Sequence, residues 1–201
     1  MALFRLIRDV LITLSYRWWT VILVVVLNFA AFGTLFALED QFEQLTGTPV
    51  YDTQNDLTPE MLRQQISFYQ GEARSAYFRF AAFDFVFPLV AAVFVALIWT
   101  LMLRVNTWKL PQRLLQLGLP LFALIVTLWD WLENISLLLI LNAGTDPANG
   151  LVEAALFFKR LKLTWLFLTG PITLVIGLFL LANVIYRPQG RAAVSRTPPQ
   201  V

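Results

Sequence analysis

Residues 125–141 read IVTLWDWLENISLLLIL, an apolar run interrupted by two acids and an amide. At 100° per residue, Asp130, Glu133 and Asn134 fall within about 100° of arc on one face of a helix, with Thr127 just beyond Asn134. A charged side chain at the centre of a bilayer costs at least ~2.5–3.5 kcal/mol. This polar face therefore has to point into a helix bundle or a wet cavity rather than at lipid.

The composition of the whole chain indicates a membrane protein. Of its 201 residues, 58% are hydrophobic and only 14% are charged, and the mean hydropathy is +0.67. Soluble domains have roughly 45–50% apolar and about 25% charged residues. A soluble globule could not bury so much apolar surface, and a disordered chain, a disulfide scaffold and a nucleic-acid-binding module are excluded as the main description.

The chain has no cysteine and no histidine. Without cysteine there is no disulfide, thiolate nucleophile or iron–sulfur ligation. Without histidine there is no histidine-ligated haem, imidazole-bound zinc or Ser-His triad. We therefore expect no cofactor and no metal site, although carboxylates alone could bind Mg²⁺, Ca²⁺ or Mn²⁺.

Four apolar runs are long enough to cross a bilayer, for which about 20 residues are needed. They cover approximately residues 18–38, 80–103, 114–141 and 163–186. This pattern predicts an all-α fold, a bundle of four transmembrane helices forming a single membrane domain over residues 1–186. Residues 187–201 contain three prolines and three arginines and are predicted to form a flexible cytoplasmic tail.

The distribution of Lys and Arg predicts the orientation of the spans. Nine lie on the side of the two termini: Arg5, Arg8, Arg17, Arg104, Lys109, Arg113, Arg187, Arg191 and Arg196. Six lie on the other side: Arg63, Arg74, Arg79, Lys159, Arg160 and Lys162. The positive-inside rule then places both termini in the cytoplasm. We expect a multi-pass protein of the bacterial cytoplasmic (inner) membrane.

Residues 39–79 form the predicted extracytoplasmic segment between spans one and two. Thr58-Pro59-Glu60 is typical of a helix start, with a Thr N-cap, proline at the first helical position and an acid in the first turn. The predicted short helix runs from Pro59 to about Tyr69. It either lies on the surface of the bilayer or bundle, or closes the mouth of a pocket as a lid.

Further polar groups lie at the same depth in neighbouring spans. Counting ~1.5 Å per residue places Asp84, Asp130 and Glu133 in the outer half of the membrane, where the basic residues of span four also enter. Pro88 has no N–H, so the carbonyl of Asp84 loses its helical partner. Opposite charges at one depth predict a polar site that opens outward.

Several of these residues belong to short motifs. They are Gly71-x-x-Arg74-x-x-Tyr77, Asp84-x-x-x-Pro88, Asp130-x-x-Glu133-Asn134 and a basic stretch opening span four. Over roughly residues 58–170 the chain resembles a group of uncharacterised bacterial four-helix integral membrane proteins that share such motifs. The resemblance implies the architecture and adds Arg74 and Tyr77 to the candidate site, but it implies no reaction. The basic position of span four is divided here among Lys159, Arg160 and Lys162.

The intramembrane acids admit three interpretations. They could pair with Lys162 or Arg160 to fix the helix register, bind a ligand or take part in catalysis, or form part of a proton or ion pathway. Two carboxyl groups at i and i+3 could supply acid–base chemistry if burial raised the pKa of one and not of the other. The spacing alone does not decide whether the protein is an enzyme.

We expect a pocket in the outer half of the bilayer that binds, and could chemically alter, a lipid or other amphiphile. Asp84, Asp130 and Glu133 would contact the head group or act as acid and base, and Asn134 would orient them. Lys162 or Arg160 would hold an anionic group. The alternative functions are an accessory or scaffolding subunit of a larger membrane complex and, less favoured, a proton-coupled transporter. The expected partners are membrane lipids and other membrane proteins or a second copy of the chain, with no nucleic acid.

Overall fold

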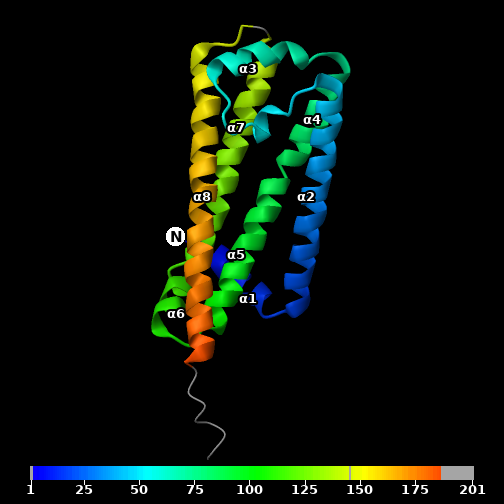
Figure 1. Cartoon of the computed structure of the whole chain (residues 1–201). Coiled ribbons are helices and arrows are strands. Elements are labelled where there is room, and N and C mark those ends of the chain that lie inside the picture. Colours follow the sequence, from blue (N-terminus) through cyan, green and yellow to red (C-terminus); the bar gives the residue numbers. More distant parts are fainter. Residues whose placement is uncertain (1, 145, 187–201) are drawn as a thin grey trace, which may run out of the picture.

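The computed structural model describes residues 2–144 and 146–186, in which helices are joined by short loops and no strand occurs. Four helical segments are long and apolar enough to cross a membrane, which confirms the predicted all-α fold (Figure 1). They are α2 (Trp18–Thr46), α4 (Gly71–Asp84) with α5 (Phe87–Val105), η3 (Leu119–Leu124) with α7 (Ile125–Ala143), and α8 (Asn149–Ile185). The predicted tail at residues 187–201 lies outside the described residues.

The helices extend well beyond the predicted spans at one end of the bundle. Helix α8 has 37 residues, or about 55 Å, whereas the hydrocarbon core of a bilayer is about 30 Å thick. It begins at Asn149 rather than near residue 163, because residues 149–162 continue the helix and pack against α7 and α3. The segment between spans one and two, predicted at residues 39–79, is likewise shorter in the structure, because α2 continues to Thr46 and α4 begins at Gly71.

The extended end of the bundle, which we call the α3 end, has its own apolar core. Between α2 and α4 the chain forms η1 (Tyr51–Thr53), α3 (Pro59–Gln65) and η2 (Ile66–Phe68). The predicted helix start is confirmed, because the Thr58 side chain accepts a hydrogen bond from the Met61 N–H at 3.2 Å. Helix α3 lies across the end of the bundle (Figure 1).

At the opposite end the chain forms two short helices, and the second contains the first residues of the predicted span 114–141, which in the structure begins at Leu119 instead. Helix α1 (Ala2–Ser15) packs against α5, and α6 (Lys109–Gln116) connects α5 to η3. Arg104 donates from Nη2 to the carbonyl of Ser15 at 2.9 Å, which ties α5 to the end of α1. We call this the α1 end.

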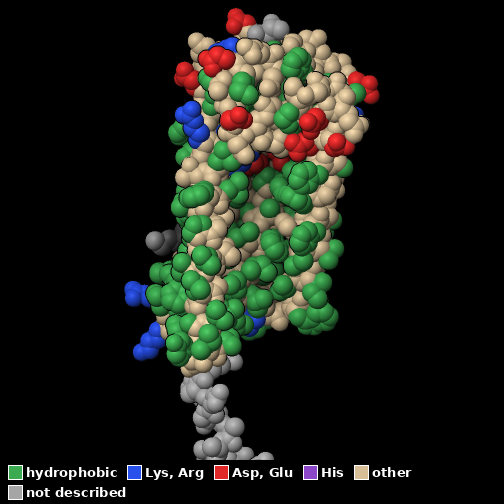
Figure 2. Space-filling model, viewed as in Figure 1, with side chains coloured by type: hydrophobic (Ala, Val, Ile, Leu, Met, Phe, Trp, Pro, Cys, Tyr) green, Lys and Arg blue, Asp and Glu red, His purple; other side chains and the backbone are tan. Residues whose placement is uncertain are grey.

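Charge divides the two ends. The chain has 13 Asp and Glu residues, and all but one belong to the half of the molecule nearer the α3 end. The exception is Asp9 in α1. Figure 2 shows acidic side chains gathered at that end, above a broad band in which hydrophobic side chains dominate. The band is the surface expected to contact lipid.

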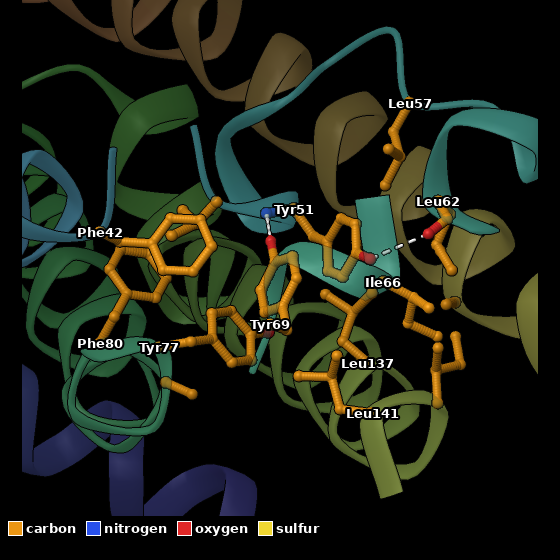
Figure 3. Close-up of a cluster of buried hydrophobic side chains, with 14 of the residues drawn as sticks. Phe42, Tyr51, Leu57, Leu62, Ile66, Tyr69, Tyr77, Phe80, Leu137 and Leu141 are labelled. Carbon is orange, nitrogen blue, oxygen red and sulfur yellow. Dashed lines mark hydrogen bonds between the residues drawn. The ribbon is translucent and has the colours of Figure 1, made fainter. Parts of the chain in front are cut away.

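A cluster of buried aromatic rings holds η1 in place at the α3 end (Figure 3). The rings of Tyr51 and Tyr69 stack with centroids 4.3 Å apart, and Tyr77 contacts Tyr69 edge-on. Tyr69 Oη accepts from the Tyr51 N–H at 2.9 Å, and Tyr51 Oη donates to the carbonyl of Leu62 at 2.9 Å. The hydroxyl groups of Tyr51 and Tyr69 therefore each make a hydrogen bond, and these bonds fix the position of the next residue, Asp52.

Candidate functional site

Six buried charged side chains meet below the aromatic cluster, and we call them the charge cluster. They are Asp52 from η1, Asp84 from α4, Asp130 and Glu133 from α7, and Lys159 and Lys162 from α8. None is more than 8% exposed. The burial of six ionisable side chains requires close pairing, because an isolated charge loses its hydration inside a protein.

Helical periodicity accounts for much of this arrangement. Asp130 and Glu133 are three residues apart on α7, and Lys159 and Lys162 are three apart on α8, so each pair occupies one face of its helix. The two helices pack along each other, which brings the faces together. Helices α8 and α4 both begin at the α3 end (Figure 1). Lys162 and Asp84 each lie about 20 Å from the start of their helix, which places them at a similar depth in the bundle.

Glu133 connects both lysines. Its Oε1 lies 3.0 Å from Lys159 Nζ, and its Oε2 lies 2.5 Å from Lys162 Nζ. Lys162 also pairs with Asp130 Oδ1 at 3.1 Å. Glu133 is 1% exposed, so both of its carboxylate oxygens are committed to ion pairs inside the bundle.

Lys159 uses its whole donor capacity within the protein. Besides Glu133, its ammonium group donates to the carbonyls of Tyr51 and Asp52, each at 2.9 Å. An ammonium group has three N–H donors, and all three are occupied. Lys159 therefore joins α8, α7 and η1, a structural role that the sequence analysis did not assign to it.

The break between α4 and α5 supplies carbonyl groups that α7 satisfies. The prediction that Pro88 frees the Asp84 carbonyl is confirmed, because α4 ends at Asp84 and the Asn134 amide approaches that carbonyl at 3.4 Å. Trp131 Nε1 donates to the carbonyl of Phe85 at 2.8 Å. Side chains of α7 thus replace hydrogen bonds that the helix lacks at this depth, as a membrane environment requires.

Asn134 also bridges two acids of the cluster. Its Nδ2 donates to Asp84 Oδ2 at 3.0 Å and to Asp130 Oδ2 at 3.3 Å. Its Oδ1 is buried and has no hydrogen-bond partner within the described part of the chain. The amide orientation is fixed, because the flipped form would place this oxygen against two carboxylates. Asn134 therefore contacts two of the three acids that it was expected to orient.

Asp52 enters the cluster from the aromatic side. Tyr77 Oη donates to Asp52 Oδ2 at 3.1 Å. Burial, reinforced by the nearby Glu133 carboxylate, raises the pKa of Asp52 to about 6, because the ammonium groups of Lys162 and Lys159 oppose the shift only in part. Asp52 is the acid of the cluster that the sequence analysis missed, since it lies in the segment between α2 and α3, where no helical periodicity marks it.

A cavity of about 220 Å³ lies beside the charge cluster, and we call it the cluster cavity. Its polar wall is formed by Asp52, Asp84, Asp130 and Lys162. Its apolar wall includes Leu35, Phe80, Phe87, Ala91, Leu163 and Leu166. Figure 2 shows a hollow between α8 and α2 with acidic side chains visible at its upper end. Because Leu35 belongs to α2 and Leu166 to α8, the cavity faces the surface expected to contact lipid.

Helix α3 does not line this cavity. The polar wall is closed toward the α3 end by Asp52, Thr53 and Asn55 of the preceding segment, whereas Leu62 of α3 is buried in the aromatic core. The surface-helix interpretation of residues 59–69 therefore describes the structure, and the lid interpretation does not.

Two residues predicted for the site lie elsewhere. Arg74 donates to Asn142 Oδ1 at 3.1 Å, and its guanidinium lies 5.4 Å from the centre of the Phe78 ring. Arg160 is exposed and makes no ion pair with any described residue. The reason is geometric, because one residue along a helix turns the side chain by 100°, so Lys159 and Arg160 cannot share the face toward α7.

The other predicted site residues lie within or beside the charge cluster: Asp84, Asp130, Glu133, Asn134, Lys162 and, through Asp52, Tyr77. In the described residues, no group of three or more acidic side chains is arranged to hold a metal ion. The chain matches no family model, no curated protein and no solved structure.

Proposed function

We propose that the protein binds a membrane amphiphile in the cluster cavity, with its polar head against Asp84 and Asp130 and its apolar chain between α2 and α8. The observation that carries this proposal is the two-sided lining of the cavity. Charged groups that are almost fully buried form one wall, and Leu and Phe side chains form the other. A site of this kind is complementary to a molecule with a polar end and an apolar end.

The depth of the cavity supports the same function. Below the α4–α5 break, α5 has 19 residues, or about 28 Å, and its single charge, Arg104, lies in the last turn. This length matches the ~30 Å hydrocarbon core of a bilayer. The charge cluster then lies at the boundary between lipid head groups and acyl chains, the depth at which an amphiphile presents its head.

The size of the cavity limits how much of the ligand it encloses. Pockets that hold an entire drug-sized molecule have volumes of roughly 300–1,000 Å³, whereas the cluster cavity measures about 220 Å³. Only a head group and the first carbons of a chain would enter. The rest of the chain would remain in the hollow between α2 and α8, in contact with bilayer lipid.

Within this proposal the α3 end faces the extracytoplasmic side and both termini are cytoplasmic. The support is the number of Lys and Arg residues counted along the sequence, nine in the segments on the side of the two termini against six on the other side, together with the positive-inside rule. The bacterial inner membrane is the location that the resemblance described above implies. A chemical change to the bound molecule would use the carboxylates of the cavity as acid and base.

The proposal is tested by filling the cavity without changing its charges. Ala91 lines the cluster cavity, and Ala91→Leu adds three carbons to its apolar wall. Ala30→Leu is the matched control, because Ala30 is an exposed alanine on α2 outside the cavity lining. Native mass spectrometry of protein extracted gently from its own membrane, with lipid analysis, measures what remains bound.

We expect one amphiphile per chain in the wild type and in Ala30→Leu, and its loss in Ala91→Leu. Equal retention by both variants would contradict the proposal. Stable protein partners without a specific amphiphile would instead support the alternative, an accessory subunit of a larger membrane complex in which the charge cluster only joins helices.

A further inference from the structure

We infer that the head group received by the cluster cavity carries an ammonium group, rather than a phosphate or carboxylate. This inference rests on the proposed amphiphile-binding function and specifies its ligand. It follows from the charge balance of the cluster, the hydrogen-bonding groups left free beside the cavity and the aromatic part of the cavity wall.

Four carboxyl groups meet only two ammonium groups in the charge cluster, so the acids outnumber the cations. Lys159 does not line the cavity, and its three donors are occupied. Lys162 lines the cavity but is held by both Asp130 and Glu133. Neither lysine lies within 4 Å of a carboxyl oxygen of Asp52 or Asp84, so these two acids of the cavity wall have no ion-pair partner in the described chain.

The free groups beside the cavity are mainly acceptors. Asp84 is 5% exposed, and its Oδ2 accepts from Asn134, while its Oδ1 accepts no hydrogen bond from any described residue. Asp52 likewise uses only Oδ2, toward Tyr77. Both acids line the cavity. A primary ammonium group brings a positive charge and three N–H donors to a wall that is short of donors.

An anionic head group would meet the opposite situation. It would face the carboxylates of Asp52, Asp84 and Asp130 and find at most one free N–H, on Lys162. The sequence-based prediction that Lys162 or Arg160 holds an anionic group therefore has no support in the geometry. The ammonium group of Lys162 already pairs with Asp130 and Glu133. Arg160 is exposed and does not line the cavity.

The apolar wall also suits a cation. Phe87 lines the cavity together with the acids and is only partly buried, and an aromatic ring attracts a nearby ammonium group. A small head group fits a volume of about 220 Å³. We therefore specify a primary amine on an aliphatic chain as the ligand chemistry.

The test compares three probes with the same chain and different head groups: dodecylamine, dodecanol and dodecanoate at pH 7.5. Each is titrated into purified full-length protein in lipid nanodiscs, and binding is read by native mass spectrometry. We expect dodecylamine to bind at one per chain, roughly tenfold or more tightly than dodecanoate, the range expected from charge-assisted hydrogen bonds.

Variants then assign the binding to the acids. Asp84→Asn should weaken dodecylamine binding roughly tenfold or more. Asp52→Asn provides a second variant if Asp84→Asn does not fold, and Glu60→Gln, which removes an exposed acid of α3, should leave affinity unchanged.

The outcomes separate this inference from the function on which it rests. Dodecanoate or dodecanol binding as tightly as dodecylamine, with the binding blocked by Ala91→Leu, overturns the ammonium inference and leaves the amphiphile site standing. Dodecylamine binding that is unaffected by both Asp variants also overturns the inference. Failure of all three probes to bind overturns the inference and the proposed function together.

Discussion

Two isosteric changes from acid to amide should affect stability differently, because Glu133 and Asp84 have different partners. Glu133→Gln removes the carboxylate shared by Lys159 and Lys162, whose distances to it are 3.0 and 2.5 Å. Asp84→Asn removes a carboxylate that has no lysine within 4 Å in the described chain and receives its hydrogen bond from Asn134.

The expected magnitudes follow from these contacts. Removing one partner of a buried ion pair typically costs about 3–5 kcal/mol, because the other charge is left uncompensated. Glu133→Gln should lower the free energy of unfolding by this amount. Asp84→Asn retains an amide oxygen for Asn134 and removes a buried acid that has no ion-pair partner, so we expect a loss below ~1 kcal/mol or a gain in stability.

The measurement is equilibrium unfolding by SDS in dodecylmaltoside micelles, followed by circular dichroism and tryptophan fluorescence. The exposed Glu60→Gln is the control and should change stability by no more than about 0.5 kcal/mol. Equal losses in Glu133→Gln and Asp84→Asn, or a loss below ~1 kcal/mol in Glu133→Gln, would refute the division into a structural acid and a cavity acid.

Three further variants test other parts of the structure. The pKa of Asp52 is raised to about 6 in the folded protein, so the folded state holds this proton more tightly than the unfolded state and stability falls as pH rises from about 4 to 6. Asp52→Asn should therefore be more stable than the wild type at pH 7.5, by up to about 3 kcal/mol, and lose this advantage near pH 4 in the same SDS titration; an unchanged difference across this range would contradict the raised pKa. Gly118→Ala should lose about 1–2 kcal/mol, because φ is +79° and the added Cβ would overlap the Phe4 ring; wild-type stability would contradict the observed turn. Arg160→Gln should leave both stability and dodecylamine binding within error of wild type, and a loss of either would place Arg160 at the site.

Much of the architecture could be predicted because its signals are local. Hydrophobic length identifies the four apolar segments, and 3.6-residue periodicity places Asp130, Glu133 and Asn134 on one face of α7. The missing N–H of Pro88 predicts that the Asp84 carbonyl loses its helical partner, and in the structure the Asn134 amide approaches this carbonyl instead. Each of these properties depends on residues within one or two helical turns.

The remaining features depend on packing between distant segments. Whether Lys159, Arg160 or Lys162 meets the acids is decided by the rotation of α8 against α7, which the spacing within one helix does not determine. Asp52 reaches the cluster because Tyr51, Tyr69 and Tyr77 fix η1 above it, and no periodic pattern marks a short loop segment. Helix α1 has fewer residues than a membrane span requires, so hydrophobic length does not identify it.

The most direct test of the central claim is a crystal structure of the wild-type protein grown in a lipidic mesophase. We predict elongated density in the cluster cavity, with its head within hydrogen-bonding distance of Asp84 or Asp130 and its chain leaving between Leu35 of α2 and Leu166 of α8. A cavity that is collapsed, or that holds only water while Lys162 keeps its pairs with Asp130 and Glu133, would contradict the account and leave the charge cluster as a structural connection between helices.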